Sequence, residues 1–91
     1  MEEKYTWEFS KKADKNFKKL DKQIQIRIIQ WLEDHIEGSE NPRKWGAALS
    51  GKLGTFWKYR VGAYRIIADI QDNKFIVEVV KVGKRGQVYK K

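Results

Sequence analysis

The sequence contains no cysteine, and this absence excludes several kinds of chemistry at once. Disulfide bonds, thiolate nucleophiles and the cysteine ligands of zinc or iron–sulfur centres all require a residue that the chain does not have. Its single histidine, His35, also excludes a histidine-rich metal site and catalysis by paired imidazoles. We therefore expect neither a metal nor another cofactor, and any catalysis would have to use other side chains.

Long apolar runs are missing as well. No segment approaches the roughly 20 apolar residues that span a bilayer, and the first residues, Met1 to Lys4, lack the pattern of a signal segment. We expect a soluble, cytoplasmic protein. The 91 residues suffice for one small domain and not for two, so we expect a single domain over residues 1–91.

Negative charge is scarce in the second half of the chain. Residues 1–42 hold eight Lys and Arg against nine Asp and Glu, whereas residues 43–91 hold twelve against three. The net charge of +8 therefore comes from the C-terminal half. Such an asymmetry favours an anionic partner, either nucleic acid, an acidic protein or an anionic membrane. A solvated charged face without a partner is the alternative.

Hydrophobic periodicity predicts one strand and two helices in the first half. Aromatic residues alternate with polar ones over about residues 4–9, as in a half-buried strand. Ser10 is a suitable N-cap for a short helix with a lysine-rich outer face. Asp21 is expected to cap a second helix that runs to about Glu37 and stops at Gly38. Both helices would need a sheet to bury their apolar sides.

The second half predicts three strands, over residues 56–61, 64–71 and 74–82. Gly62-Ala63 suits a two-residue type II′ turn, and Asp72-Asn73 suits a type I′ turn. We therefore predict an α+β fold. It comprises an N-terminal strand, a two-helix hairpin and a three-stranded antiparallel meander, with the helices packed on one face of the sheet.

The two predicted turns fix the strand register and hence the composition of each face of the sheet. Arg60 would pair with Arg65, and Gln71 with Lys74. One face is almost wholly apolar and would pack on the helices. The other face mixes cations with apolar groups, and no remaining segment of the chain would cover it. This open face comprises Phe56, Lys58, Arg60, Arg65, Ile67, Asp69, Ile76, Glu78, Val80 and Val82.

The cations of the open face indicate an anionic ligand. Arg60 opposite Arg65, with Lys58 two residues away, is unfavourable in a purely structural sheet because like charges facing across strands destabilise it. A phosphate would satisfy both the charge and the forked donors of the guanidinium groups. In the alternative interpretation, Asp69 and Glu78 neutralise the arginines as ordinary cross-strand pairs.

The tail after the last strand, residues 83–91, adds four cations and one aromatic residue, Tyr89. Cations beside a ring that can stack on a base are typical of proteins that bind RNA or other single-stranded nucleic acid. A membrane surface is a poorer partner, because neither helix combines a strongly apolar face with a basic opposite face.

Three motifs and the order of the elements resemble the RelE/ParE superfamily of toxins from bacterial and archaeal toxin–antitoxin pairs. The motifs are GKL at residues 51–53, YRVGAYRII at 59–67 and VGKRGQVY at 82–89. The resemblance covers essentially the whole chain and is strongest to the RelE branch, whose members cut messenger RNA in the ribosomal A site. It implies a ribosome-dependent endoribonuclease, or mRNA interferase, that inhibits translation and is held by an acidic, RelB-like antitoxin.

The resemblance also assigns residues. It places a strand lysine at Lys58, the hairpin arginine at Arg65, the tail arginine at Arg85 and the terminal tyrosine at Tyr89, and these four are the catalytic candidates. Contacts to RNA phosphates are expected from Arg60, Lys84 and Lys52.

The chain departs from the family pattern at three positions. Phe56 stands where some members have a second strand lysine, and Lys84 replaces a histidine that many members place after the tail glycine. Gly86 stands where an additional basic residue is common. These departures leave the acid–base assignment open.

Cleavage of RNA by its own 2′-hydroxyl requires no metal, but it needs a base, donors for the charge of the transition state and an acid for the leaving oxygen. Neighbouring cations disfavour the charged form of a lysine, so Lys58 or Lys84 is a candidate base. Arg65 would hold the phosphate, and Arg85 would stabilise the leaving oxygen. Tyr89 would stack on a nucleotide or orient it.

Two other functions stay open at this point. A toxin of the ParE branch poisons DNA gyrase by protein contact, but it does not need the lysine, the two arginines and the tyrosine together. A basic RNA-binding module without catalysis would use the same cations as a nuclease. The sequence therefore does not distinguish an RNA-binding module from a nuclease.

Overall fold

The structure is a computed structural model that describes residues 3–49 and 56–88. Within these ranges, no helix is long and apolar enough to cross a membrane. The elements are β1 (Thr6–Phe9), α1 (Lys11–Lys18), α2 (Lys22–His35), the 3-10 helix η1 (Pro42–Lys44), β2 (Ala47–Ala48), β3 (Trp57–Val61), β4 (Tyr64–Gln71) and β5 (Ile76–Lys84).

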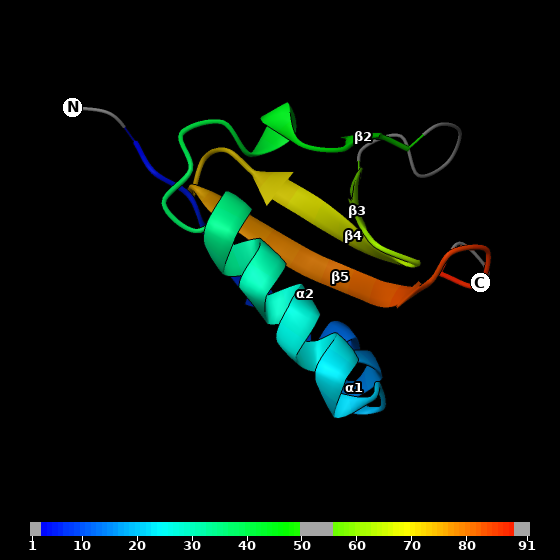
Figure 1. Ribbon diagram of the computed structural model, residues 1–91. Coiled ribbons are helices and arrows are strands. Elements are labelled where there is room, and N and C mark those ends of the chain that lie inside the picture. Colours follow the sequence, from blue (N-terminus) through cyan, green and yellow to red (C-terminus); the bar gives the residue numbers. More distant parts are fainter. Residues whose placement is uncertain (1–2, 50–55, 89–91) are drawn as a thin grey trace.

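The strands form one mixed sheet in the order β1-β5-β4-β3-β2, and the predicted α+β class is confirmed. β1 runs parallel to β5, whereas β5, β4, β3 and β2 pair antiparallel. Figure 1 shows α2 crossing in front of β5, with α1 near the start of α2. The sequence did not predict the partner of β1, and it did not predict β2.

The helices begin and end close to the predicted residues. The Ser10 hydroxyl accepts a hydrogen bond of 3.1 Å from the backbone N–H three residues later, which caps α1. Asp21 occupies the N-cap of α2 without a side-chain hydrogen bond. α2 ends at His35, two residues before the predicted end, and the chain then reaches Gly38 with a φ of +77°. A glycine in the left-handed conformation commonly follows the end of a helix, as predicted here for Gly38.

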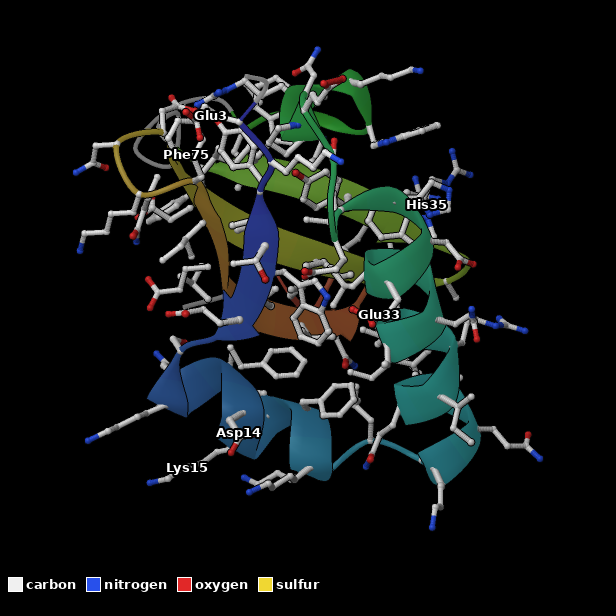
Figure 2. The ribbon with its side chains drawn as sticks, turned by 90° about the vertical axis from the view of Figure 1, so that its left-hand side faces the viewer. Glu3, Asp14, Lys15, Glu33, His35 and Phe75 are labelled. Carbon is white, nitrogen blue, oxygen red and sulfur yellow. The ribbon has the colours of Figure 1, made fainter. Side chains whose placement is uncertain are left out.

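The core lies between the helices and one face of the sheet. No charged side chain of the described residues is buried. Glu33 of α2 accepts a hydrogen bond of 2.7 Å from the Trp7 indole of β1, so a polar link joins helix and strand at the border of the core (Figure 2). The buried core residues are Tyr5, Ala13, Phe17, Ile28, Leu32, Ile36, Tyr59, Val61, Ile66, Ala68, Val77, Val79 and Val82.

The β3–β4 hairpin has the predicted turn and register. Gly62 adopts a φ of +60°, as the first central position of a type II′ turn requires, and Arg60 pairs with Arg65. Because cross-strand partners lie on the same face, the two arginines lie side by side on the face opposite the helices. The hairpin therefore creates the cationic cluster that the sequence predicted.

The predicted β4–β5 turn is wrong by two residues. Gln71 pairs with Ile76 instead of Lys74, so the connection has four residues, ending at Phe75 with a φ of 55°. The Phe75 ring packs edge-on against Tyr5 at 5.3 Å, a contact with the N-terminal segment that a two-residue turn would not place there. A shift of the β4–β5 register by two residues keeps each side chain on its predicted face of the sheet. The apolar residues of β5 before the bulge therefore lie on the predicted face.

A β-bulge in β5 corrects a second prediction. The register shifts between Ile67 and Ala68, which leaves Val80 as an extra residue opposite β4. The extra residue reverses the alternation beyond it. Val82, predicted on the open face, therefore points into the core and is 5% exposed.

The open face is also covered in part, contrary to the prediction. After β5 the chain turns, and the Val88 N–H donates to the Lys84 carbonyl at 3.0 Å. A Cβ built on Gly83 would lie 3.5 Å from the Val88 Cβ, so Val88 packs directly over this glycine. Val88 is 3% exposed and Ile67, on the same face, is 4% exposed. The tail thus covers the part of the open face around Gly83, which pairs with Arg65.

Candidate functional site

Four predicted site residues gather in one depression on the open face. The depression has a volume of about 380 Å³ and is lined by Lys58, Arg60, Arg65 and Arg85. The first two residues come from β3, the third from β4 and the last from the turn after β5. Figure 1 shows the closed end of the β3–β4 hairpin and this turn at the same end of the sheet.

Backbone carbonyl groups of the β3–β4 turn position two of the three arginines that line the depression. Arg65 Nη1 donates hydrogen bonds of 2.9 Å to the carbonyls of Gly62 and Tyr64. The Arg85 backbone N–H donates to the Ala63 carbonyl, also at 2.9 Å. One tight turn therefore fixes the Arg65 guanidinium group and fastens the tail that carries Arg85.

Neutralisation of the arginines by carboxylates of the same face is not observed. Asp69 and Glu78 pair with each other across β4 and β5. The Gln71 amide donates to both, at 3.2 Å and 3.4 Å. Among the described residues, no carboxylate forms an ion pair with Arg60 or Arg65. The face is thus divided into an acidic end and a cationic end.

The cationic end has the donors to bind a phosphate. Both side-chain hydrogen bonds of Arg65 use Nη1, and no described residue bonds its Nε–Nη2 edge. That edge matches two oxygens of a phosphate in a bidentate contact. An anion placed there would also relieve the repulsion between Arg60 and Arg65.

A second depression of about 260 Å³ adjoins the first, between β2 and β3. Gly46 immediately precedes β2 and has a φ of +77°. A Cβ added to this glycine would overlap the Lys58 carbonyl. Only glycine allows this close approach of the two backbones. The depression is lined by Gly46, Ala47, Lys58, Tyr59, Arg60 and Arg65.

Hydrogen bonds from two aromatic side chains of β3 hold the segment before β2 in place. The Tyr59 hydroxyl donates to the Pro42 carbonyl at 2.7 Å, and the Trp57 indole donates to the Trp45 carbonyl at 2.6 Å. Burial raises the pKa of Tyr59, so its hydroxyl remains a donor throughout the physiological range. These two bonds attach the wall of the second depression to β3.

An exposed cluster anchors the same segment to the β4–β5 turn. Arg43 makes a bidentate contact to Asp72, with both N···O distances 2.9 Å, and the Tyr5 hydroxyl donates to the same carboxylate at 2.6 Å. The hydrogen bonds from Arg43 and then Tyr5 lower the pKa of Asp72. The cluster lies outside both depressions, which makes it structural.

The other predicted site residues do not join the four cations. Lys84 pairs with Tyr64 and lines a separate depression of about 350 Å³ with Asn16 and Leu20, on the side of the helices. Alternation after the bulge places it there. Lys52 and Tyr89 lie outside the described residues.

His35 has a structural position at the end of α2 (Figure 2). Its ring stacks on Trp31 at 4.5 Å, its Nδ1 lies 2.9 Å from the Trp31 carbonyl, and Trp45 packs edge-on at 4.7 Å. Among the described residues, no group of three or more His, Asp or Glu could hold a metal ion.

The sequence did not predict that Gly46 and Ala47 line a depression or that Val88 covers part of the open face. β2 has only two residues, too few for any periodicity, and Val88 lies in a tail without a pattern. The glycine after Trp45 was the one available signal, because an isolated glycine often marks a close approach of backbones.

Comparisons with known proteins agree with this architecture. The family model described as ParE toxin of type II toxin-antitoxin system, parDE, matches residues 7–89. A RelE-like toxin protein of Escherichia coli is 32% identical over 83 residues, which cover 90% of this chain and 84% of that protein.

Two solved structures extend the comparison. The toxin–antitoxin complex RelBE2 of Mycobacterium tuberculosis contains a chain that superposes with a TM-score of 0.80 at 25% identity, over 90% of this chain and 99% of that one. The isolated RelE toxin of E. coli has a TM-score of 0.71 at 28% identity, over 93% and 90%. With a family model matching almost its full length, the chain belongs to the RelE/ParE superfamily of toxins of type II toxin–antitoxin systems.

Proposed function

We propose that this toxin is a ribosome-dependent endoribonuclease that cuts messenger RNA in the A site and thereby inhibits translation. The observation that carries the proposal is the depression lined by Lys58, Arg60, Arg65 and Arg85. Its arginines have no carboxylate partner among the described residues. Such a cluster suits a substrate that brings its own negative charge, as a phosphodiester does.

The proposed reaction is an in-line transesterification. The 2′-oxygen forms a bond to phosphorus while the bond from phosphorus to the 5′-oxygen breaks, which gives a 2′,3′-cyclic phosphate and a 5′-hydroxyl. Lys58 accepts the proton of the 2′-hydroxyl, and water returns a proton to the 5′-oxygen. Arg65 binds the non-bridging oxygens through its Nε–Nη2 edge, and Arg85 stabilises the charge on the leaving oxygen. Tyr89 stacks on a nucleotide.

The division of roles between the lysines can be tested by substitution. Lys58→Ala is expected to lose most of the single-turnover rate, because Lys58 lines the depression with both catalytic arginines. Lys84→Ala is expected to lose less, because Lys84 lines a depression on the other side of the sheet. Near wild-type cleavage by Lys58→Ala would reduce Lys58 to a phosphate contact and assign the base elsewhere.

Dependence on the ribosome follows from the weak intrinsic chemistry of the site. A lysine and two arginines replace the histidine pair that RNA cleavage commonly uses, so acid–base catalysis is limited. A ribosome that holds the message in a reactive geometry would supply a large part of the rate by orientation. Free RNA is therefore expected to be bound but cut slowly.

We also propose an acidic antitoxin as the partner. The M. tuberculosis relative was solved as a toxin–antitoxin complex, and this chain carries a net charge of +8. An amphipathic helix or extended segment of an acidic, RelB-like protein would mask the cations or displace the tail. Co-expression with the product of the adjacent gene should yield a complex that no longer cleaves. A complex that still cleaves would contradict neutralisation by this contact.

The test of the function is controlled expression with mapping of messenger-RNA ends in translating and non-translating extracts. New ends within codons are expected only during translation. Arg65→Ala should abolish them, whereas Arg27→Ala should not. Arg27 is a stringent control, because its exposed side chain on α2 reaches the Gly62 turn, within 3.1 Å of a Cβ built on that glycine, but lines neither depression. Equal cleavage in both extracts would contradict dependence on the ribosome.

Inhibition of DNA gyrase is the second candidate, because the matching family model is described as a ParE toxin. A supercoiling assay with purified gyrase distinguishes the two functions. Inhibition of gyrase without new messenger-RNA ends would favour the ParE-like function. Binding of RNA that weakens with salt, without either effect, would instead indicate a non-catalytic RNA-binding module.

A further inference from the structure

The two depressions of the open face form one continuous surface. They share Lys58, Arg60 and Arg65. They differ at their far ends, because Arg85 lines the first, whereas the edge strand β2 lines the second. A phosphate bound by the shared cations would therefore have a cationic surface on one side and a wall of small residues on the other.

We propose that the depression between β2 and β3 is a nucleobase subsite, which receives the base next to the cleaved phosphate. The inference rests on the RNA cleavage proposed above and adds to it the element that contacts the base. In a nucleotide the base is joined to the phosphate through the sugar, so a site beside the phosphate-binding cations is where a neighbouring base would lie. No role of this kind follows from the cationic cluster alone.

The wall of this subsite consists of the smallest side chains. Ala47 pairs with Lys58, so its methyl group lies on the same face as the cations. Gly46 has no side chain, and none larger would fit against the Lys58 carbonyl. A glycine followed by an alanine leaves a low, largely apolar wall, which a flat ring can approach closely.

Beyond the three shared cations, the depression is lined by Gly46, Ala47 and Tyr59, which offer no charge to a second phosphate. Its volume of about 260 Å³ equals that of several water molecules at about 30 Å³ each, which is room for a planar ring. Bases that leave their stack are commonly held against aromatic rings or guanidinium planes. Arg60 is exposed and has no hydrogen bond among the described residues, so its guanidinium group can lie over the ring.

The wall is already in place without a ligand. Tyr59 and Trp57 of β3 hold the carbonyls of Pro42 and Trp45 at 2.7 Å and 2.6 Å, on the segment that leads into Gly46. A preformed wall requires little ordering on binding, which favours affinity. The subsite should therefore bind a nucleotide in the free protein, before any ribosome is present.

The chain offers a matched pair of substitutions. Ala47 and Ala48 are adjacent, exposed residues of the same short strand, but Ala48 pairs with Trp57 and lies on the opposite face. Ala47→Leu places a bulky side chain in the subsite. Ala48→Leu adds the same side chain outside it. Ala47→Val, which suits an edge strand, is a second filling variant in case the leucine disturbs folding.

The experiment is a titration of the isolated protein, followed by NMR, with inorganic phosphate and with each nucleoside 5′-monophosphate. Wild type and Ala48→Leu should bind at least one monophosphate about fivefold more tightly than phosphate, the low end of base-stacking contributions. This advantage should disappear in both Ala47 variants while phosphate binding remains. No advantage in wild type, or an advantage retained in folded Ala47 variants, would overturn the subsite.

The nucleotide titration and the cleavage assay test the subsite and the nuclease activity separately. A nucleotide advantage that depends on Ala47, together with no cleavage on ribosomes, would support the subsite and contradict the nuclease. Cleavage on ribosomes by a protein without this advantage would support the nuclease and contradict the subsite. In an active protein, Ala47→Leu should also change which nucleotides flank the cut, and Ala48→Leu should not.

Discussion

The Arg65→Ala variant tests whether Arg65 acts in cleavage or stabilises the fold. The expected change in the free energy of unfolding can be worked out from the contacts of Arg65. The substitution removes two hydrogen bonds of 2.9 Å, to the carbonyls of Gly62 and Tyr64. Bonds of this kind contribute about 0.5–1.5 kcal/mol each where both partners are buried, and less at an accessible turn where water replaces them. The substitution also removes the repulsion from Arg60, a gain of about 0.2–1 kcal/mol.

The two effects nearly cancel. The free energy of unfolding of Arg65→Ala should therefore stay within about 0.5 kcal/mol of wild type, as for most surface substitutions. In a chain of 91 residues such a change shifts the Tm by no more than about 4 °C. Thermal unfolding followed by circular dichroism measures this shift.

The effect on activity should be far larger. Loss of one preorganised donor to a transition-state oxyanion typically lowers the rate by about 10²–10³-fold. Single-turnover cleavage on programmed ribosomes should fall by this factor in Arg65→Ala, whereas Arg27→Ala stays near wild type. Arg65→Lys should recover only part of the loss, because an ammonium group cannot form the forked contact.

Two results would contradict the proposed role of Arg65. If Arg65→Ala lost its cooperative thermal transition, the arginine would be a structural partner of the hairpin. If the variant stayed folded and cleaved at the wild-type rate, Arg65 would not contact the reacting phosphate.

Two further predictions concern the framework of the site. Tyr59→Phe should lower the free energy of unfolding by about 1–3 kcal/mol in urea denaturation, because it leaves the buried Pro42 carbonyl without its donor; an unchanged midpoint would contradict this. Hydrogen bonds from Arg43 and Tyr5 lower the pKa of Asp72, so their stabilisation is present above pH 3.8 and is lost as the pH falls through the lowered pKa. Asp72→Asn should remove this part of the acid dependence of unfolding, and an unaltered pH profile would contradict the assignment.

The cationic site could be predicted because local signals determine it. Gly62 and Ala63 fix a two-residue turn, and strict alternation on both sides of the turn then places Arg60 beside Arg65. Neither step depends on a residue far away in the sequence. The pairing of the two arginines therefore follows from the sequence alone.

The errors occur where distant contacts decide the local structure. The β4–β5 turn is longer than predicted because Asp72 is bound by Arg43 and Tyr5, from two other segments. The bulge at Val80 has no local signature, yet it moves Val82 into the core and turns Lys84 away from the cations. A periodic pattern predicts faces reliably only up to the first irregularity in the strand.

We propose that the cationic depression cuts RNA held by the ribosome. The most direct measurement incubates purified toxin with a defined message, on programmed ribosomes and free in solution, and identifies the ends of the products. The proposed nuclease activity predicts one cut within the A-site codon, on ribosomes alone, with a 2′,3′-cyclic phosphate on one fragment and a 5′-hydroxyl on the other. A message that stays intact on programmed ribosomes would contradict it.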